Sequence, residues 1–275
     1  MSSRAAAPPL AWARAMPTLL RVGMSETLAY RAEFVVWMLT TTLPLVMLGL
    51  WTSVADDAQG PFGSFTSDHF VAYYLITLIL RNITGSWVVW QLDSDIRNGT
   101  LSMRLLRPVH PFVTYAATHL ASVPLRGVVA LPFTAILLLA SARQLLTDDP
   151  VLIAVFFGSL VGAWAITFFL QVMIGTLAFY VDKTQALFEI YLGVFAVLSG
   201  YLIPLAMLPG WAQEIAALAP FRYVLAFPVE TLMGLHDRAE ALRLLAVQWL
   251  FVIGTYTASR IIWRAGIRRY EAFGS

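Results

Sequence analysis

Charged residues set into an otherwise apolar sequence are the ones whose types and spacing could do chemistry. The segment from Gln91 to Pro108 alternates aspartates and arginines with leucines at helical spacing, and Asn98-Gly99 divides it. This pair predicts a chain reversal that ends one short helix and lets Thr100 or Ser102 cap the next. The leucine stripe is too short to span a bilayer, but it suits docking into a groove on another protein. Leucines that only pack on the bilayer surface would give the same pattern.

Arg81 lies in the middle of an apolar run. A guanidinium near the centre of a bilayer costs about 3 kcal/mol or more, so it must face protein or water. Polar neighbours suggest a translocation path for a molecule with polar or anionic groups. The alternative is a structural arginine bonded to carbonyls or to Glu189. The residues that we predict to line the path are Arg81, Asn82, Thr84, Thr40 and Thr41.

Several enzyme classes are excluded by what the sequence lacks. It has no cysteine, which removes thiolate nucleophiles and Cys-ligated zinc. Its only lysine, Lys183, follows Asp182 and not a glycine, so there is no Walker A loop to cradle phosphates. The four histidines make no HExxH motif. We therefore predict no catalytic residue, no metal site and no cofactor in this chain.

The elements that hold these residues are membrane helices. Of 275 residues, 59% are hydrophobic and only 12% are charged, and the net charge of +2 gives no basic field for nucleic acid. A bilayer core about 30 Å thick needs roughly 20 apolar residues in a helix. Six segments meet that length: Phe34 to Val54, Phe70 to Trp90, Phe112 to Ala140, Val151 to Tyr180, Ala186 to Pro204, and Leu242 to Trp263.

Loop charges predict the orientation. Twelve of the basic residues fall on one side of the six spans and four on the other, so the positive-inside rule places both termini in the cytoplasm. Before the first span, one helical face would carry Arg14, Thr18, Arg21 and Ser25, and the opposite face would carry Trp12, Met16, Leu19 and Gly23. This pattern predicts an amphipathic helix on the cytoplasmic surface of the membrane. We expect this helix to begin or kink at Pro17. A flexible basic tail is the alternative.

Smaller signals concern helix packing. The segment from Pro204 to Glu240 contains four prolines and predicts short helices at the outer interface. Pro132 permits a kink in the third span. Arg126 in that span lies nearer the cytoplasmic end and can snorkel to the surface, so we expect it to have a structural role. Gly158 and Gly162 form a GxxxG pair that would allow close helix approach.

Three stretches together resemble one family. The order Asp95-Ile-x-x-Gly-Thr-Leu followed by Leu-Leu-Arg-Pro108 looks like the cytoplasmic loop of ABC-2 type permeases, the membrane subunits of bacterial ABC exporters. Gly200-Tyr-Leu-Ile-Pro204, with the prolines after it, is similar to the outward-facing segment of that family, and Arg268-Arg269-Tyr270 resembles the tail of one subgroup. Asp95 stands where the family more often has glutamate, and Arg81 is not expected from the family pattern.

The resemblance implies a coupling helix between Asp93 and Arg107 that fits a cleft on a separate ATPase subunit. That subunit would bind ATP and Mg and close on a second copy of itself. The other implied partners are a second permease, identical or related, and membrane lipid, with no nucleic acid. The residues implied to couple to the ATPase are Asp93, Asp95, Arg97, Leu101, Arg104, Leu105 and Arg107.

The fold predicted is an all-α membrane protein with six transmembrane helices in the bacterial cytoplasmic (inner) membrane. We expect a cytoplasmic N-terminus with an interfacial helix over residues 1–30, the transmembrane domain over 31–265 and a cytoplasmic tail over 266–275. The coupling loop would cover 91–110 and the outward-facing segment 204–240. Alternative functions are a secondary transporter or channel without an ATPase, a membrane scaffold of a larger machine, and, last, an intramembrane enzyme.

Overall fold

Helices make up nearly all of the described chain, because apolar segments must pair their own backbone groups where no water is near. The computed structural model describes residues 11–29, 42–57 and 65–273, and in these ranges it is all-α, with no β-sheet. Its α-helices are α1 (Ala11–Ala29), α3 (Leu43–Asp57), α4 (Ser67–Thr84), α5 (Val88–Arg97), α6 (Leu101–Leu105), α7 (Pro111–Ala142), α8 (Pro150–Thr176), α9 (Thr184–Leu198), α10 (Gly210–Leu218), α11 (Ala226–Leu232) and α12 (Arg238–Phe273).

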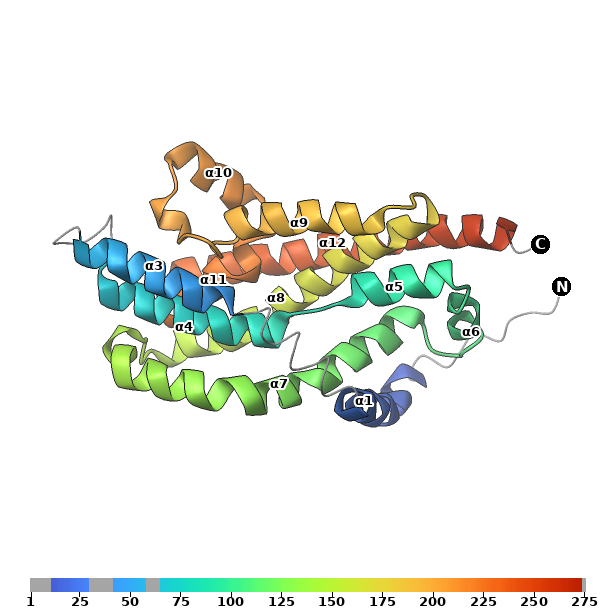
Figure 1. Ribbon diagram of the computed structural model, residues 1–275, viewed down its shortest axis with the longest axis horizontal. Helices are drawn as coiled ribbons and strands as arrows, with labels where there is room; N and C mark the ends of the chain where they lie inside the picture. The colour runs from blue at the N-terminus through green and yellow to red at the C-terminus, as the bar shows by residue number, and fades with distance from the viewer. Residues whose placement is uncertain (1–10, 30–41, 58–64, 274–275) are drawn as a thin grey trace.

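The long helices run along one axis of an elongated bundle (Figure 1). One end carries α6 and the C-terminal part of α12, and we call it the α6 end. The opposite end carries α10 and the start of α8, and we call it the α10 end. α1 lies beside α7 and is viewed nearly along its axis, so it runs across the long helices.

Among the residues that the structure describes, two helices are long and apolar enough to cross a membrane: α8 with the turn after it (Pro150–Phe179), and α12 over Arg238–Tyr270. A third candidate is α7, if its halves Pro111–Val128 and Leu131–Leu145 count as one span across a 54° bend. Pro132 explains the bend, since its ring clashes with the carbonyl of Val128 one turn earlier and leaves that carbonyl without a donor. Two to three spans are thus identified, and six spans stay a prediction.

The second predicted span, Phe70 to Trp90, is interrupted in the structure. α4 ends at Thr84 and α5 begins at Val88. Arg126 of α7 stabilises the break, because its guanidinium donates to the carbonyl of Gly85 at 2.9 Å. This side chain is fully buried, so the expectation that it snorkels to the surface was wrong. Its buried charge instead holds a broken helix in place.

The other span boundaries differ as well. Residues 34–41 of the first predicted span, and with them Thr40 and Thr41, lie outside the described residues, and the rest of that span is α3. The fifth predicted span, Ala186 to Pro204, ends early: α9 has 15 residues, about 22 Å of helix. The chain leaves the helical path at Gly200, whose φ of +85° suits glycine.

The predicted N-terminal helix is present as α1, with the predicted faces. Thr18, Arg21 and Ser25 are exposed, while Gly23 is buried against Ala121 of α7. In the described residues α1 covers Ala11–Ala29 and contains Pro17 in its interior, so it does not begin at Pro17, and a kink at Pro17 stays a prediction. The short helices expected in the segment from Pro204 to Glu240 are α10 and α11.

The α8–α12 pair shows the close approach predicted for the two glycines. Gly158 lies in ordinary contact with Leu245, whereas Gly162 lies directly against the side-chain amide of Gln248. That amide donates to the carbonyls of Ser159 and Tyr223, at 2.9 and 2.8 Å. Only a glycine leaves room for a buried amide that joins three segments of the bundle.

We expect Gly162→Ala to lower the free energy of unfolding by about 1–3 kcal/mol, because the added Cβ would lie 2.7 Å from the Gln248 amide and displace its two hydrogen bonds. The matched control is Gly158→Ala one turn earlier, which should be neutral or stabilising by up to about 1 kcal/mol. Unfolding of the detergent-purified chain by dodecyl sulfate, followed by circular dichroism, measures both. Equal losses in the two variants would contradict this packing.

Candidate functional site

The candidate site is the helical turn at the α6 end, where α5 reverses into α6. The predicted reversal is confirmed: Asn98 ends α5, and Gly99 takes a φ of +74°, a conformation that favours glycine. Thr100 is the N-cap of α6, but its hydroxyl does not cap the helix. The carbonyl of Gly99 accepts a hydrogen bond from the hydroxyl of Tyr270 at 3.2 Å, which ties the turn to α12.

Asp95 holds this turn together. Its Oδ2 accepts from Arg104 Nε and from the Tyr115 hydroxyl, both at 2.6 Å, and its Oδ1 accepts from the Thr100 hydroxyl at 2.7 Å. Thr100 and Arg104 belong to the start and the body of α6, and Tyr115 belongs to α7, so one carboxylate on α5 joins α5, α6 and α7. The guanidinium of Arg104 also lies 4.8 Å from the centre of the Tyr115 ring. Hydrogen bonds to a charged acceptor are the stronger kind.

Arg97 braces α5 on its other side. Its Nε donates to both carboxylate oxygens of Asp93 at 3.0 Å, and its Nη2 donates to the carbonyl of Asp182, just before α9. Four residues predicted to contact an ATPase, Asp93, Asp95, Arg97 and Arg104, therefore bind groups of their own chain. The sequence showed their charges, but not that they pair with each other.

Three exposed side chains on α6 and directly after it form a small surface that we call the α6 face: Met103, Leu106 and Arg107. Met103 is 66% exposed and Leu106 is 77% exposed, while Leu101 is fully buried and Leu105 is half-buried. Leu101 is among the residues predicted to contact an ATPase, whereas Met103 is not. On a helix, position 103 lies opposite position 101, so burial of Leu101 turns Met103 outward.

Arg81, the residue predicted to line a path, is half-buried between aromatic rings. Its guanidinium carbon lies 4.9 Å from the centre of the Phe195 ring and 5.1 Å from that of Tyr201. In the part of the chain that the structure describes it makes no ion pair, with Glu189 or any other carboxylate, and its Nε is buried without a hydrogen-bond partner. Asn82 and Thr84 donate to carbonyls of their own helix, at 2.9 and 2.8 Å.

The α10 end contains a second polar cluster, around the carboxylate of Glu230. Arg222 Nη2 lies 3.4 Å from a carboxylate oxygen of Glu230. His236 contacts two carboxylates: its Nε2 lies 3.1 Å from Glu230, and its Nδ1 lies 3.3 Å from Glu240. Burial by itself would lower the pKa of His236, but the hydrogen bond to Glu230 and the charges of both glutamates outweigh burial and raise that pKa above its usual value. The cluster joins α11 to the start of α12, and its residues were not singled out from the sequence.

We expect Asp95→Asn to lower the free energy of unfolding by about 1.5–3 kcal/mol, because the neutral amide cannot satisfy donors on both of its atoms. Amide hydrogen exchange should rise across residues 98–107. Asp93→Asn is the matched control: its pair with Arg97 is a surface contact between side chains 28% and 36% exposed, so the loss should stay below about 1 kcal/mol. Unchanged exchange in the Asp95 variant would show that the carboxylate does not hold the turn.

Comparison with known proteins places this architecture in a family. A family model described as ABC-2 family transporter protein matches residues 38–274, which include the turn, the broken helix and the segment between α9 and α12. No curated protein and no solved structure matches the chain. The chain therefore belongs to the ABC-2 family of transporter proteins and is a multi-pass membrane permease of ABC-type transport.

Proposed function

We propose that this chain is the permease subunit of an ATP-driven exporter in a bacterial cytoplasmic membrane, and that a separate ATPase subunit docks on the α6 face. The observation that carries the proposal is the contrast within one short turn. Four of its charged residues, Asp93, Asp95, Arg97 and Arg104, are paired inside the chain, whereas Met103 and Leu106 are exposed. Exposed apolar side chains on a rigid support are suited to a groove on a partner.

The same turn can transmit a push. α6 is held to α5 and α7 through Asp95 and to α12 through Tyr270. Leu101 packs in a cluster with residues of α5, α7, α8 and α12. A force on the α6 face therefore reaches four longer helices through packed and hydrogen-bonded contacts, which is what mechanical coupling needs.

Nucleotide chemistry would belong to the partner. The ATPase would bind ATP and Mg, and the only lysine here, Lys183, follows Asp182 and so has no phosphate-binding loop around it. The chain then contributes the moving helices and no catalytic residue. With the α6 end in the cytoplasm, both termini lie on the cytoplasmic side, as the loop charges predict.

A second permease, identical or related, completes the proposed complex. α9 supports this partner, because it exposes Ile190 and Val194 and also Glu189 along one short helix. A carboxylate exposed to lipid is costly, so a second copy packed on α9 would give Glu189 a protein environment.

The proposed translocation path runs beside Arg81, Asn82 and Thr84. Arg81 supports it because the described structure gives this cation aromatic neighbours and no carboxylate, which leaves its charge available to an anionic or polar substrate. Arg126 differs from it, since carbonyls and a hydroxyl bind its guanidinium.

The path can be tested by thiol labelling, because the chain has no native cysteine. We expect Thr84→Cys, in the assembled complex, to react with a small water-soluble thiol reagent at a rate that changes when ATP is added. Leu80→Cys is the control, since Leu80 is equally buried, four residues earlier in the same helix, and lies in the apolar core. Equal rates at the two positions would contradict the path.

The docking proposal is tested by purifying the tagged chain from its native membranes and detecting an ATPase. Burying a leucine-sized side chain contributes about 1.5–3 kcal/mol, so Met103→Glu combined with Leu106→Glu should lower ATPase recovery about tenfold or more. Trp211→Glu combined with Leu218→Glu, at exposed positions of α10, is the control and should leave recovery unchanged. If the unaltered chain brings down no ATPase, a secondary transporter or a scaffold replaces the exporter.

A further inference from the structure

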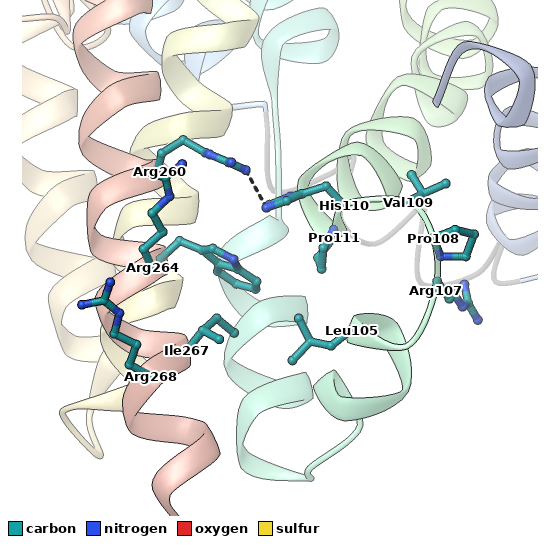
Figure 2. Close-up of a pocket in the computed structure, with 11 residues that line it drawn as sticks. Leu105, Arg107, Pro108, Val109, His110, Pro111, Arg260, Arg264, Ile267 and Arg268 are labelled. Carbon is teal, nitrogen blue, oxygen red and sulfur yellow. Dashed lines mark hydrogen bonds between the residues drawn. The ribbon is translucent and has the colours of Figure 1, made fainter. Parts of the chain in front are cut away.

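A pocket of about 520 Å³ opens at the α6 end, between the loop that follows α6 and the C-terminal part of α12. Figure 2 shows the loop residues on one side and α12 on the other, with Arg260 and Ile267 pointing toward the loop and the guanidinium of Arg268 pointing away from it. Leu105, Ile267 and Trp263 supply apolar walls. The basic residues of the wall are Arg107, His110, Arg260, Arg264 and Arg268.

The charge of this pocket is unbalanced. Among the side chains that the structure describes, which end at Tyr270, its walls contain four arginines and no aspartate or glutamate. None of the four makes an ion pair with those side chains, although arginines elsewhere in the chain do form such pairs. Arg260, Arg264 and Arg268 recur every four residues, so they form one stripe on α12, and like charges at that spacing repel each other. An anion in the pocket would remove this repulsion.

The contacts of His110 also leave a hydrogen-bond donor of this pocket without an acceptor. Arg260 Nη1 lies 2.6 Å from its Nε2, the contact drawn in Figure 2, and the amide of Phe112 donates to its Nδ1 at 3.1 Å. A neutral imidazole has only one acceptor nitrogen, so it cannot accept both bonds. Burial and the charges of Arg260 and Arg264 lower the pKa of His110 to about 4, so the ring stays neutral. At least one donor in this corner therefore lacks a full acceptor.

The position of the pocket along α12 indicates which anion would occupy it. Ile253, Tyr256 and Ile261 are exposed apolar residues of α12, and the arginine stripe begins beside the last of them, at Arg260. Trp263, at the same level of α12, is buried in the bundle and forms an apolar wall of the pocket. The lipid phosphates lie at this depth, and guanidinium groups bind phosphate oxygens in pairs.

We propose that this pocket binds the phosphate of an anionic phospholipid headgroup, held between the loop after α6 and α12. The apolar walls would contact the glycerol and the first part of the acyl chains. Bound there, the lipid joins residues 107–110 to α12 through charge, in addition to the bond from Tyr270. The proposal needs only a membrane-embedded chain and does not depend on the ATPase. The pocket shares Arg107 with the α6 face, but Met103 and Leu106, the side chains proposed to dock, do not line it.

Native mass spectrometry of the detergent-purified chain tests this binding, with phosphatidylglycerol and phosphatidylcholine of identical acyl chains as probes. We expect the chain to prefer phosphatidylglycerol, and Arg264→Gln combined with Arg268→Gln to weaken that binding by about fivefold for each arginine. The control removes the same charge elsewhere. It combines Arg269→Gln with Arg243→Gln, because Arg269 lies over the Tyr180 ring and Arg243 lies near the α10 end.

The outcomes separate the possible ligands. If millimolar glycerol phosphate displaces phosphatidylglycerol, the pocket is a phosphate site, but its ligand is a soluble phosphate compound. If it does not, the source is lipid. Equal binding of phosphatidylglycerol by the pocket variant and the control overturns the proposal. The absence of any preference for phosphatidylglycerol also overturns it, and would favour an acidic protein segment as the ligand of the pocket. Circular dichroism of both variants shows whether they fold alike.

Discussion

Polar groups inside an apolar bundle must find their partners within the chain, and this constraint decides where the helices of the permease break and meet. Arg126 binds the carbonyl that the interruption between α4 and α5 would otherwise leave open. Gln248 joins α8, α12 and the turn before α11. Asp95 does the same for α5, α6 and α7. Arg126 and Gln248 would each cost several kcal/mol if left alone in hydrocarbon, so each fixes local geometry more strongly than apolar contacts can.

The sequence predicted what depends on short-range patterns. Helical class, the faces of α1, the reversal at Gly99 and the close approach at Gly162 all follow from spacing along one segment. It could not predict what depends on pairing between segments. Asp95 and Arg104 were predicted to contact another protein because the sequence shows their charges. It does not show that the two side chains lie close enough to pair with each other. Burial of Leu101 and exposure of Met103 likewise depend on which side of a five-residue helix meets the bundle.

Arg81 and Arg126 show why residue type alone does not determine the role of a side chain. From the sequence, Arg81 lies at mid-span and Arg126 near the end of a span, so Arg126 was expected to reach water. In the structure Arg126 is the fully buried one, with carbonyl and hydroxyl acceptors, and Arg81 has aromatic rings around it. Hydrogen bonds to carbonyls compensate a buried guanidinium, whereas ring faces compensate it less. The less compensated cation is the better candidate for contact with a transported molecule.

α12 connects the two ends of the molecule. Near its start Arg238 binds Asp149 at 2.5 Å, and Gln248 binds the carbonyl of Tyr223. Near its end Tyr270 binds the reversal between α5 and α6. A continuous helix of 36 residues, about 54 Å long, resists bending more than these single hydrogen bonds resist breaking. A shift of α6 therefore either breaks the bond from Tyr270 or displaces α12 as a rod. An anion between the arginine stripe and the loop after α6 strengthens the same joint, and so favours displacement of α12 over breakage.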